Sequence, residues 1–442
     1  MKKLIYLLIG ISTSISAQES KAENLIKIQS SFSYKMLEPN QDLRKINVLL
    51  AEKQRPELAS SKLIIGTSLI SIFDYQISSI DSKFGYLMRH PTSNNQIGTE
   101  VSELVVHSFQ ASVYGQVNNW LSAYSEILYN PEQSFGQGTI TGLNRNQLQL
   151  RKAYILIGDL KNRPFYMAVG KMDSPFGQMG SVSPFTNSTM WHAFGGLAYG
   201  GQFGVNYKGL NAVVMAVQGG AQFRGLNTAV AGTNVPSRIN NFVGDINYTY
   251  KISKTEDNTN LKNSTVKIGA SYMHGSAYCH EFPVVHFDPC RENNPAITAY
   301  AHLNLKEKII LKGGYAVTLN VWPGTHNPTP PLDVWEASKV SSFDIGGKYL
   351  FNQKKNIQYA ISGEFSNFIA GPEGSPWERQ NQYILGFSGM FKASSKLFVE
   401  LFRTDGYVPL NFISGGNMGP GETHSVRNAY SNGIVIGGMI TL

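Results

Sequence analysis

The stretch from Gln147 to Lys208 decides the fold. It reads QLQLRKAYILIG, DLKNR, PFYMAVGKM, a long segment rich in Gly, Ser and Pro, and then AYGGQFGVNYK. Three runs of alternating apolar residues are therefore joined first by a short polar link and then by a long loop. An antiparallel barrel in a bacterial outer membrane has this rhythm, with tight turns on the periplasmic side and long loops outside. The stretch predicts an all-β transmembrane barrel.

The same alternation of short and long links continues from Lys62 to the end of the chain. Short links fall at Asn118-Asn119, Lys208-Gly209, Lys306-Glu307 and Ala393 to Ser395. We predict about 16 strands, an even number that returns both termini to the periplasm. The expected strands cover 62–76, 103–117, 120–129, 147–158, 164–172, 198–208, 211–218, 239–252, 264–275, 296–305, 308–318, 341–351, 357–366, 381–391, 396–403 and 429–442.

The composition agrees with a membrane barrel. The chain has 442 residues, of which 42% are hydrophobic and 15% charged, with 43 Gly and 22 Tyr. After the N-terminus, no stretch reaches the ~18 consecutive apolar residues of a membrane helix. A chain that meets lipid without apolar helices must close its backbone hydrogen bonds in a barrel, because an open sheet edge in lipid is too costly.

The N-terminus divides into two parts before the barrel. Residues 1–17 have the charged start, the apolar run and the small-residue cleavage site of a signal peptide. Residues 18–61 form a polar segment in which 37–55 has helical spacing. We expect a short periplasmic helix there, with an oligomerising coiled coil as the alternative. At roughly 40 residues the segment is too small to plug a wide lumen as a plug domain does. The barrel then covers residues 62–442.

Within the expected strands, the side chains sort into two faces. In the run 341–351, Phe343 and Ile345 alternate with Asp344 and Lys348 on the opposite side. The apolar face must meet lipid, because a Lys at mid-membrane on that face costs ~2–4 kcal/mol. The polar face therefore lines water. In the run 147–158 both faces carry apolar residues, so the sequence does not indicate which face points to the lumen.

The polar faces supply the candidates for a pore lining. Lysines outnumber carboxylates among them, and rings of Lys and Arg favour anions in a pore. We therefore expect an anionic solute; the alternative is that these charges merely keep the channel wet and pair across strands. The pore-lining candidates are Lys208, Lys251, Lys267, Lys312, Asp344, Lys348, Glu364, Lys392 and Glu400.

The long loop Asp173 to Gly196 is a candidate constriction. Its Gly and Pro residues indicate a shaped, turn-rich segment, and its aromatic residues are unfavourable in solvent unless they fold inward or meet a ligand. We predict that the loop folds into the barrel; the alternative is a packed cap over the rim. The candidate residues are Phe176, Phe185, Trp191 and His192.

Two cysteines, Cys279 and Cys290, lie in a second long loop. In an exported chain, two nearby thiols most simply form a disulfide, which by loop entropy contributes roughly 3 kcal/mol. His280 and His286 lie between them, but their spacing matches no zinc pattern. We predict the disulfide, no metal site and no cofactor. The chain also lacks a G-x-S-x-G elbow, a Walker loop and an H-E-x-x-H motif, so we expect no enzyme activity.

Several short motifs resemble those of the LbtU-type siderophore porins. They are Arg151 to Tyr154, Gly158-Asp159-Leu160, Gly170-Lys171 and Pro175-Phe176-Gly177. The resemblance implies a roughly 16-stranded outer-membrane pore that takes up iron-loaded carboxylate siderophores without a plug domain. The chain departs from that pattern at the non-aromatic C-terminal Leu442 and in its short N-terminal segment.

Taken with the basic lumen, the resemblance gives an expected function. It is uptake across the bacterial outer membrane of a small anionic ligand, in particular a ferric carboxylate siderophore. The alternatives are a general or anion-selective diffusion porin, and a surface adhesin or structural barrel. Expected partners are membrane lipid or lipopolysaccharide and the anionic solute or ferric siderophore, with no nucleic acid. The sequence leaves open whether the barrels assemble as a homo-oligomer.

Overall fold

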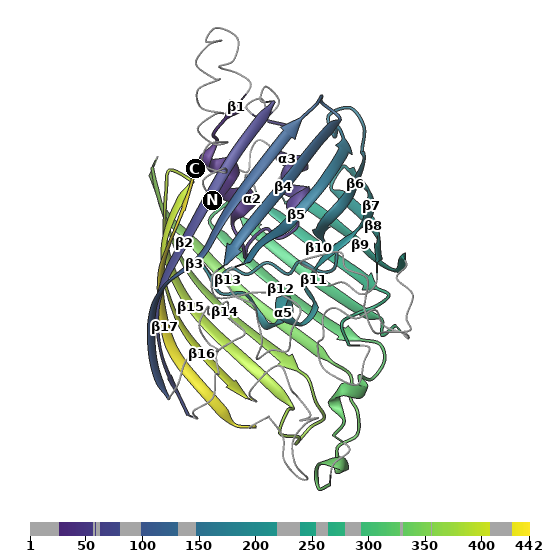
Figure 1. The fold of residues 1–442 in the computed structure, drawn as a ribbon, viewed down its shortest axis with the longest axis vertical. Coiled ribbons are helices and arrows are strands. Elements are labelled where there is room, and N and C mark those ends of the chain that lie inside the picture. Colours follow the sequence, from purple (N-terminus) through teal and green to yellow (C-terminus); the bar gives the residue numbers. More distant parts are fainter. Residues whose placement is uncertain are drawn as a thin grey trace.

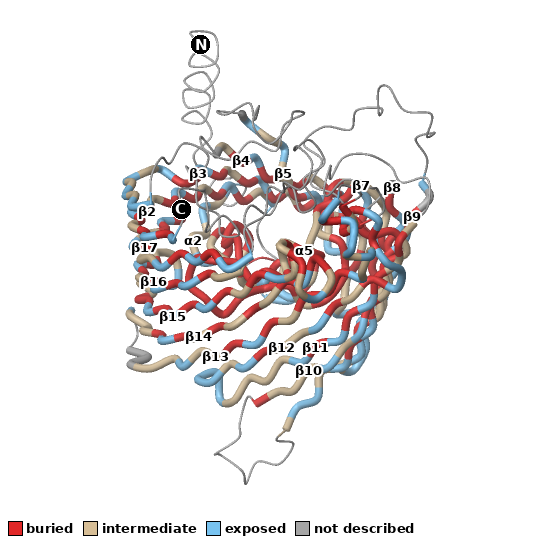
Figure 2. Tube along the Cα trace, turned by 90° about the horizontal axis from the view of Figure 1, so that it is seen from below, coloured by how far each residue is buried: buried red, intermediate tan, exposed pale blue. Residues whose placement is uncertain are grey.

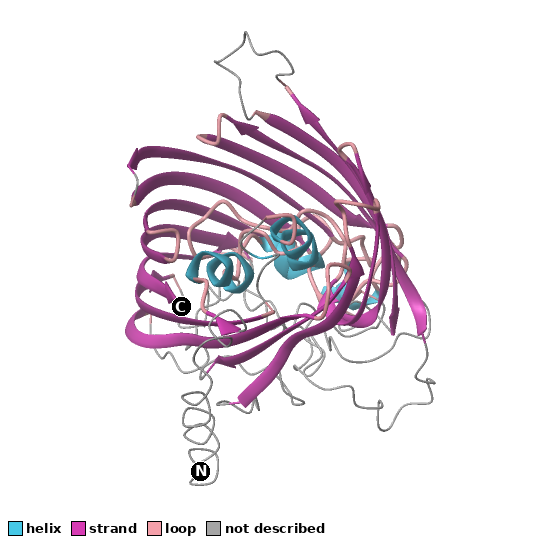
Figure 3. Ribbon diagram, turned by 90° about the horizontal axis from the view of Figure 1, so that it is seen from above, coloured by secondary structure: helices cyan, strands magenta, loops and turns pink. Residues whose placement is uncertain are grey.

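A computed structural model gives the fold. It describes residues 26–55, 58, 62–79, 99–130, 147–218, 239–252, 264–278, 293–327, 330–354, 356–406 and 427–442. These residues form one closed barrel with helices and a folded loop inside it (Figures 1 and 3).

The barrel wall consists of strands β2 to β17, each antiparallel to its neighbours in chain order. It closes where β17 pairs with β2, with Ser431 opposite Ser78 and Thr441 opposite Ser68. The prediction of a 16-stranded transmembrane barrel is confirmed. The strands are β2 (Leu63–Ser78), β3 (Glu100–Gln116), β4 (Leu121–Asn130), β5 (Gln147–Gly158), β6 (Phe165–Asp173), β7 (Leu197–Tyr207), β8 (Leu210–Gln218), β9 (Ile239–Lys251), β10 (Thr265–Met273), β11 (Ala296–Leu305), β12 (Ile309–Thr318), β13 (Ser341–Lys354), β14 (Ile357–Ile369), β15 (Arg379–Phe391), β16 (Ser395–Gly406) and β17 (Ala429–Thr441).

A short strand and several short helices complete the described elements. The strand β1 (Ile26–Lys27) pairs in parallel with the first residues of β2. The pairing of β17 with β2 begins further along, at Ser68. The helices are α2 (Ser30–Leu37), α3 (Lys45–Glu52) and α5 (Thr189–Phe194), with the 3-10 turns η4 (Pro323–Thr325) and η5 (Leu332–Val334). In the described part of the chain, no helix has both the length and the apolar character needed to cross a membrane.

The tight links between strands have left-handed backbone conformations. Lys208 and Gly209 have φ values of 48° and 93°, Lys306 and Glu307 of 54° and 57°, and Lys392 and Ala393 of 48° and 55°. Positive φ at both central residues defines the type I′ turn, whose twist matches that of the strands it joins. These links lie at the same end of the barrel as Leu442, which is the periplasmic end in this topology.

The alternation of faces predicted from the sequence is present on the wall. Ile345 points outward with 52% of its surface exposed, whereas Asp344 beside it is buried inside. On β5, the ambiguous run, Ile155 points outward and Leu156 is fully buried inside. A register shift between β4 and β5 precedes this part of the strand. The inner face of β5 carries Tyr154 and Leu156, which belong to the same buried apolar cluster as Leu49 and Leu50 of the N-terminal segment, and the buried Lys152, which is paired with Asp173.

The N-terminal segment differs from its expected position. Its described part does not lie outside the barrel but inside it, with α2 against β2 and β17 and α3 against β6 (Figure 3). It forms two helices where the sequence predicted one over 37–55. Leu43, Ile46, Leu49 and Leu50 are buried, as their spacing indicated. The segment is small for the lumen on its own, but a second segment shares the lumen with it. The signal peptide at 1–17 remains a prediction, because those residues are outside the described part.

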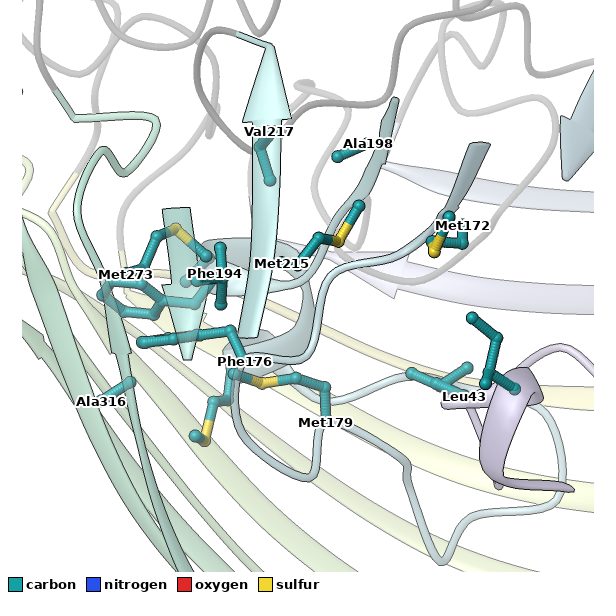
Figure 4. Packing of buried hydrophobic residues seen from close by; sticks show 14 of the residues in the cluster. Leu43, Met172, Phe176, Met179, Phe194, Ala198, Met215, Val217, Met273 and Ala316 are labelled. Atoms are coloured by element: carbon teal, nitrogen blue, oxygen red, sulfur yellow. The ribbon is translucent and has the colours of Figure 1, made fainter. Parts of the chain in front are cut away.

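That second segment is the loop between β6 and β7. Its Phe176, Met179 and Phe194 pack with Met215 of β8 and Met273 of β10 on the inner face of the wall (Figure 4). Figure 2 shows buried residues continuing from the wall into the interior. Part of the lumen is thus an apolar core, and the inner face of the wall does not line water throughout.

Candidate functional site: the lumen insert

The interior of the barrel is occupied by what we call the lumen insert. It comprises residues 30–55, with helices α2 and α3, and the loop 174–196, with helix α5 (Figure 3). The first part enters from the periplasmic end and the second from the extracellular end. The prediction that the loop folds into the barrel agrees with this arrangement.

The two parts of the lumen insert are hydrogen-bonded to each other. Asn40 Nδ2 donates to Ser183 O at 2.9 Å, and Ser181 N donates to Asn40 O at 2.7 Å. Arg44 Nη2 donates to Gly177 O at 2.6 Å. Because these bonds are buried or half-buried and several in number, the two segments form one body.

One anchor to the wall is built from Lys312, Asp344 and Glu364. The Lys312 Nζ lies 2.5 Å from Asp344 Oδ2 and 3.6 Å from Glu364 Oε2, and it also donates to Gly180 O. Glu364 in turn accepts from Ser181 Oγ at 2.9 Å and from Val182 N at 2.8 Å. Burying such charges is costly unless they are paired and hydrogen-bonded. Here Lys312 and Glu364 have both kinds of partner and Asp344 is paired with Lys312, and together they hold the loop against β12 to β14.

A second anchor uses Glu400 and Lys396 of β16. Glu400 accepts from Phe185 N at 2.6 Å, while Lys396 Nζ donates to Pro184 O at 2.6 Å and to Glu38 Oε1 at 3.1 Å. Burial alone would raise the pKa of the Glu38 carboxyl, but the charges of Lys396 and Lys45 outweigh burial, so this pKa lies below its usual value. Glu38 is therefore held as a carboxylate.

The third anchor joins Arg44 to Asp245 of β9 through two parallel hydrogen bonds. Arg44 Nη1 lies 2.6 Å from Asp245 Oδ2, and Nη2 lies 2.8 Å from Oδ1. Ser271 and Tyr300 also donate to Asp245, at 2.6 Å and 2.8 Å. The carboxylate is fully buried, so this bidentate pair is of the strong, directional kind.

The structure divides the pore-lining candidates into three groups. Lys312, Asp344, Glu364 and Glu400 lie inside the barrel, but they are buried and hold the loop. Lys208 and Lys392 lie exposed in periplasmic turns, and Lys251 lies exposed at the periplasmic end of β9. Lys267 and Lys348 lie half-buried on inward positions of β10 and β13. Among the described residues, neither of these two forms an ion pair with a carboxylate.

Lys267, His302 and Lys348 form what we call the basic strip. Lys267 is directly opposite His302 on β11, and His302 is opposite the inward-facing Lys312. Lys348 lies on the same inner face, one strand further. The charge of Asp42, exposed on the linker between α2 and α3, acts on all three, while Asp245 also acts on Lys267 and Glu38 on Lys348. At pH 7 the positive charge of the basic strip comes from Lys267 and Lys348, because an imidazole such as that of His302 is mostly neutral there.

The four constriction-loop candidates have two different environments. Phe176 and Phe185 are buried. Phe185 stacks on Phe398 of β16 with ring centroids 5.3 Å apart. Trp191 and His192 lie on α5 and are half-buried, with their rings edge to face at 4.9 Å. The phenylalanines thus fix the loop to the wall, and only the α5 pair retains exposed surface.

Sequence reasoning missed several residues of this site. His302 and Lys396 could have been found, because each continues the inward parity of its strand. Arg44, Asn40 and Glu38 carried no such signal, since nothing in the N-terminal segment indicates which wall residue each would meet. Cys279 and Cys290 lie outside the described residues, so the disulfide stays a prediction. The described residues contain no cluster of three or more potential metal ligands.

Comparison with solved structures relates the barrel to porins. The chain superposes on OprB of Pseudomonas putida with a TM-score of 0.52 and 8% identity, covering 91% of this chain and 99% of that one. The anion-selective porin of Comamonas acidovorans is similar with a TM-score of 0.48 and 12% identity over 86% of this chain and 99% of that one. At these identities the likeness concerns the fold alone. The chain has the fold of an outer-membrane porin.

Sequence comparison gives much less. No family model matches the chain. A UPF0422 protein of Coxiella burnetii is 35% identical over 69 residues, which are 16% of this chain and 13% of that protein. The match thus spans about an eighth of the relative's length. The resemblance to siderophore porins is not confirmed by these matches. The closed barrel, its apolar outer face and its porin neighbours place the protein in the bacterial outer membrane.

Proposed function

We propose that this porin-like barrel is a channel for a small anionic solute that passes along the basic strip. The observation that carries the proposal is that Lys267 and Lys348, the two cationic side chains of the basic strip, face the lumen without a carboxylate partner in ion-pair contact among the described residues. Fixed cations in a pore favour anions by direct electrostatic attraction. No bond is made or broken: the solute is drawn in, passes the lumen insert and leaves to the periplasm.

The lumen insert supports a restricted path rather than a wide one. Three sets of buried charges hold it to β9, β12 to β14 and β16. An insert fixed at three points around the wall narrows the barrel permanently, and the solute must pass beside it. A restricted path favours a solute that is selected over one that only diffuses.

We propose ferric carboxylate siderophores as the solute. Such complexes are small and anionic, which suits the basic strip, and the resemblance of the motifs around Arg151 and Pro175 points to the same class. The second candidate is an anion-selective diffusion porin. It is favoured by the distribution of the basic strip over three strands, which suits passage along a wall better than tight capture at one point.

Charge reversal tests the anionic preference. Lys312 is a poor choice because it anchors the loop, so the variant is K267E/K348E. We expect its reversal potential in a salt gradient across a planar bilayer to shift from anion towards cation selectivity. The matched control is K208E/K392E, which reverses two exposed lysines in periplasmic turns and should change selectivity much less. Equal shifts in both variants would contradict a role for the basic strip.

Ligand block distinguishes the two solutes. A ferric carboxylate siderophore that enters a restricted path should interrupt single-channel current at a concentration where a neutral sugar and inorganic phosphate do not. K267E/K348E should relieve this block. Free conduction with all three solutes would favour the diffusion porin and exclude siderophore selection.

A further inference from the structure

The extracellular ends of β15, β16 and β17 carry a second cationic site, on the outside of the barrel. An open hollow of about 120 Å³ lies there, and three arginines line it. Arg379, Arg403 and Arg427 keep 56%, 49% and 47% of their side chains exposed. We call this the arginine hollow. It lies on the outer face of the wall, whereas the basic strip faces the lumen from β10, β11 and β13.

The arginine hollow lies at the upper limit of the lipid-facing surface. On β16 the outward positions Leu397 and Leu401 are exposed and apolar, and Arg403 continues the same parity towards the extracellular end. Tyr383 lies directly opposite Arg403 on β15, and the Tyr430 ring lies 5.0 Å from the Arg403 guanidinium. Tyrosines in such a row mark the interface between the apolar band and the head groups.

Two carboxylates share the hollow but do not neutralise it. Glu378 lies 2.7 Å from Arg427 and 3.4 Å from Arg379. Asp405 lies 3.5 Å from Arg403 Nε and accepts a hydrogen bond from Asn381 at 2.9 Å. Three guanidinium groups therefore face two carboxylates, and much guanidinium surface is left for another anion. Arginine is suited to phosphate because its planar fork can bind two oxygens at once.

We propose that the arginine hollow binds the phosphate groups of the outer-leaflet glycolipid, lipopolysaccharide. The position selects the source of the phosphate. The site opens outward beside exposed leucines and tyrosines, so a ligand with acyl chains can place those chains on Leu401 and the paired Leu385 while its phosphate meets the arginines. A soluble anion would use only the charged part of this surface. Basic pockets at membrane interfaces bind anionic head groups by the same physics.

Binding of defined lipids to the full chain in mild detergent tests this. The probes are phosphorylated lipid A, the same lipid with its phosphates removed, and inorganic phosphate. We expect the protein to bind phosphorylated lipid A at least tenfold more tightly than the dephosphorylated form, and R403Q/R427Q to lose that preference. The control K208Q/K392Q, which removes two exposed charges at the opposite rim, should keep it.

Three results would overturn the proposal. They are equal affinity of the unaltered protein for both lipids, a preference that survives in R403Q/R427Q, and displacement of the lipid by inorganic phosphate alone at a similar concentration. Heat-dependent mobility on gels shows whether each variant is a folded barrel. Should the double variant not fold, the comparison of the two lipids on the unaltered protein still decides.

Discussion

Among single residues, Arg44 and Asp245 form a buried anchor between the N-terminal segment and the wall. Their pair joins the N-terminal segment to β9, and Asp245 has no exposed surface. Removing one partner of a buried pair leaves an uncompensated charge and costs about 3–5 kcal/mol. We predict that D245N releases the N-terminal segment from the lumen while the barrel stays closed. Trypsin should then cut within residues 26–55 of the folded protein, whereas the unaltered protein resists.

A double variant separates the charge effect from lost packing. In R44M/D245N no charge is left unpaired, so its loss of docking should be clearly smaller than the sum of the two single variants. An additive result would mean that the two residues act independently and that the pair is not the anchor.

Among the elements, the strands followed from the sequence and the lumen insert did not. Each strand carries its own evidence, because side chains such as Asp344 and Ile345 alternate between two environments. The inward fold of the loop was also foreseeable from its aromatic residues. The contacts within the lumen insert depend instead on residues far apart in the chain: Asn40 and Ser183 are 143 residues apart and Lys396 and Glu38 are 358 apart. No periodicity encodes such pairs, and each buried charge could equally have been taken for pore lining.

The contact between the two parts of the lumen insert can be tested at Gly180. A Cβ atom on this residue would overlap with the backbone carbonyl oxygen of Gln41. Since both are backbone positions, neither can rotate away, and overpacking of this kind costs typically 1–3 kcal/mol. We predict that G180A loosens the N-terminal segment, seen as faster trypsin cleavage within residues 26–55. G115A is the matched control, because a Cβ there would have no atom within 4 Å. Equal cleavage of both variants would show that the close contact between Gly180 and Gln41 does not hold the N-terminal segment in place.

At the scale of the whole molecule, the wall and the lumen insert are separable. β17 pairs with β2 from Ser68 onward, so the barrel closes without any residue before Leu63. If the N-terminal segment were absent, the wall would lose the short β1–β2 pairing at Leu63 and Ile64 but keep the pairing between β17 and β2 that closes the barrel. The loop 174–196 would keep its hydrogen bonds to Glu364 and Glu400. The N-terminal part thus occupies the lumen. The wall does not need it to close into a barrel.

Deleting residues 26–60 should therefore enlarge the path without opening the wall. We predict a folded barrel whose single-channel conductance exceeds that of the unaltered protein, measured at high salt so that fixed charges are screened. D245N, whose segment is released but still attached, should switch between the low and the high level. If the deletion variant folds and conducts no more than the unaltered protein, the solute does not pass beside the N-terminal segment. The restriction must then lie in the loop 174–196, which the anchors at Glu364 and Glu400 hold in place on their own.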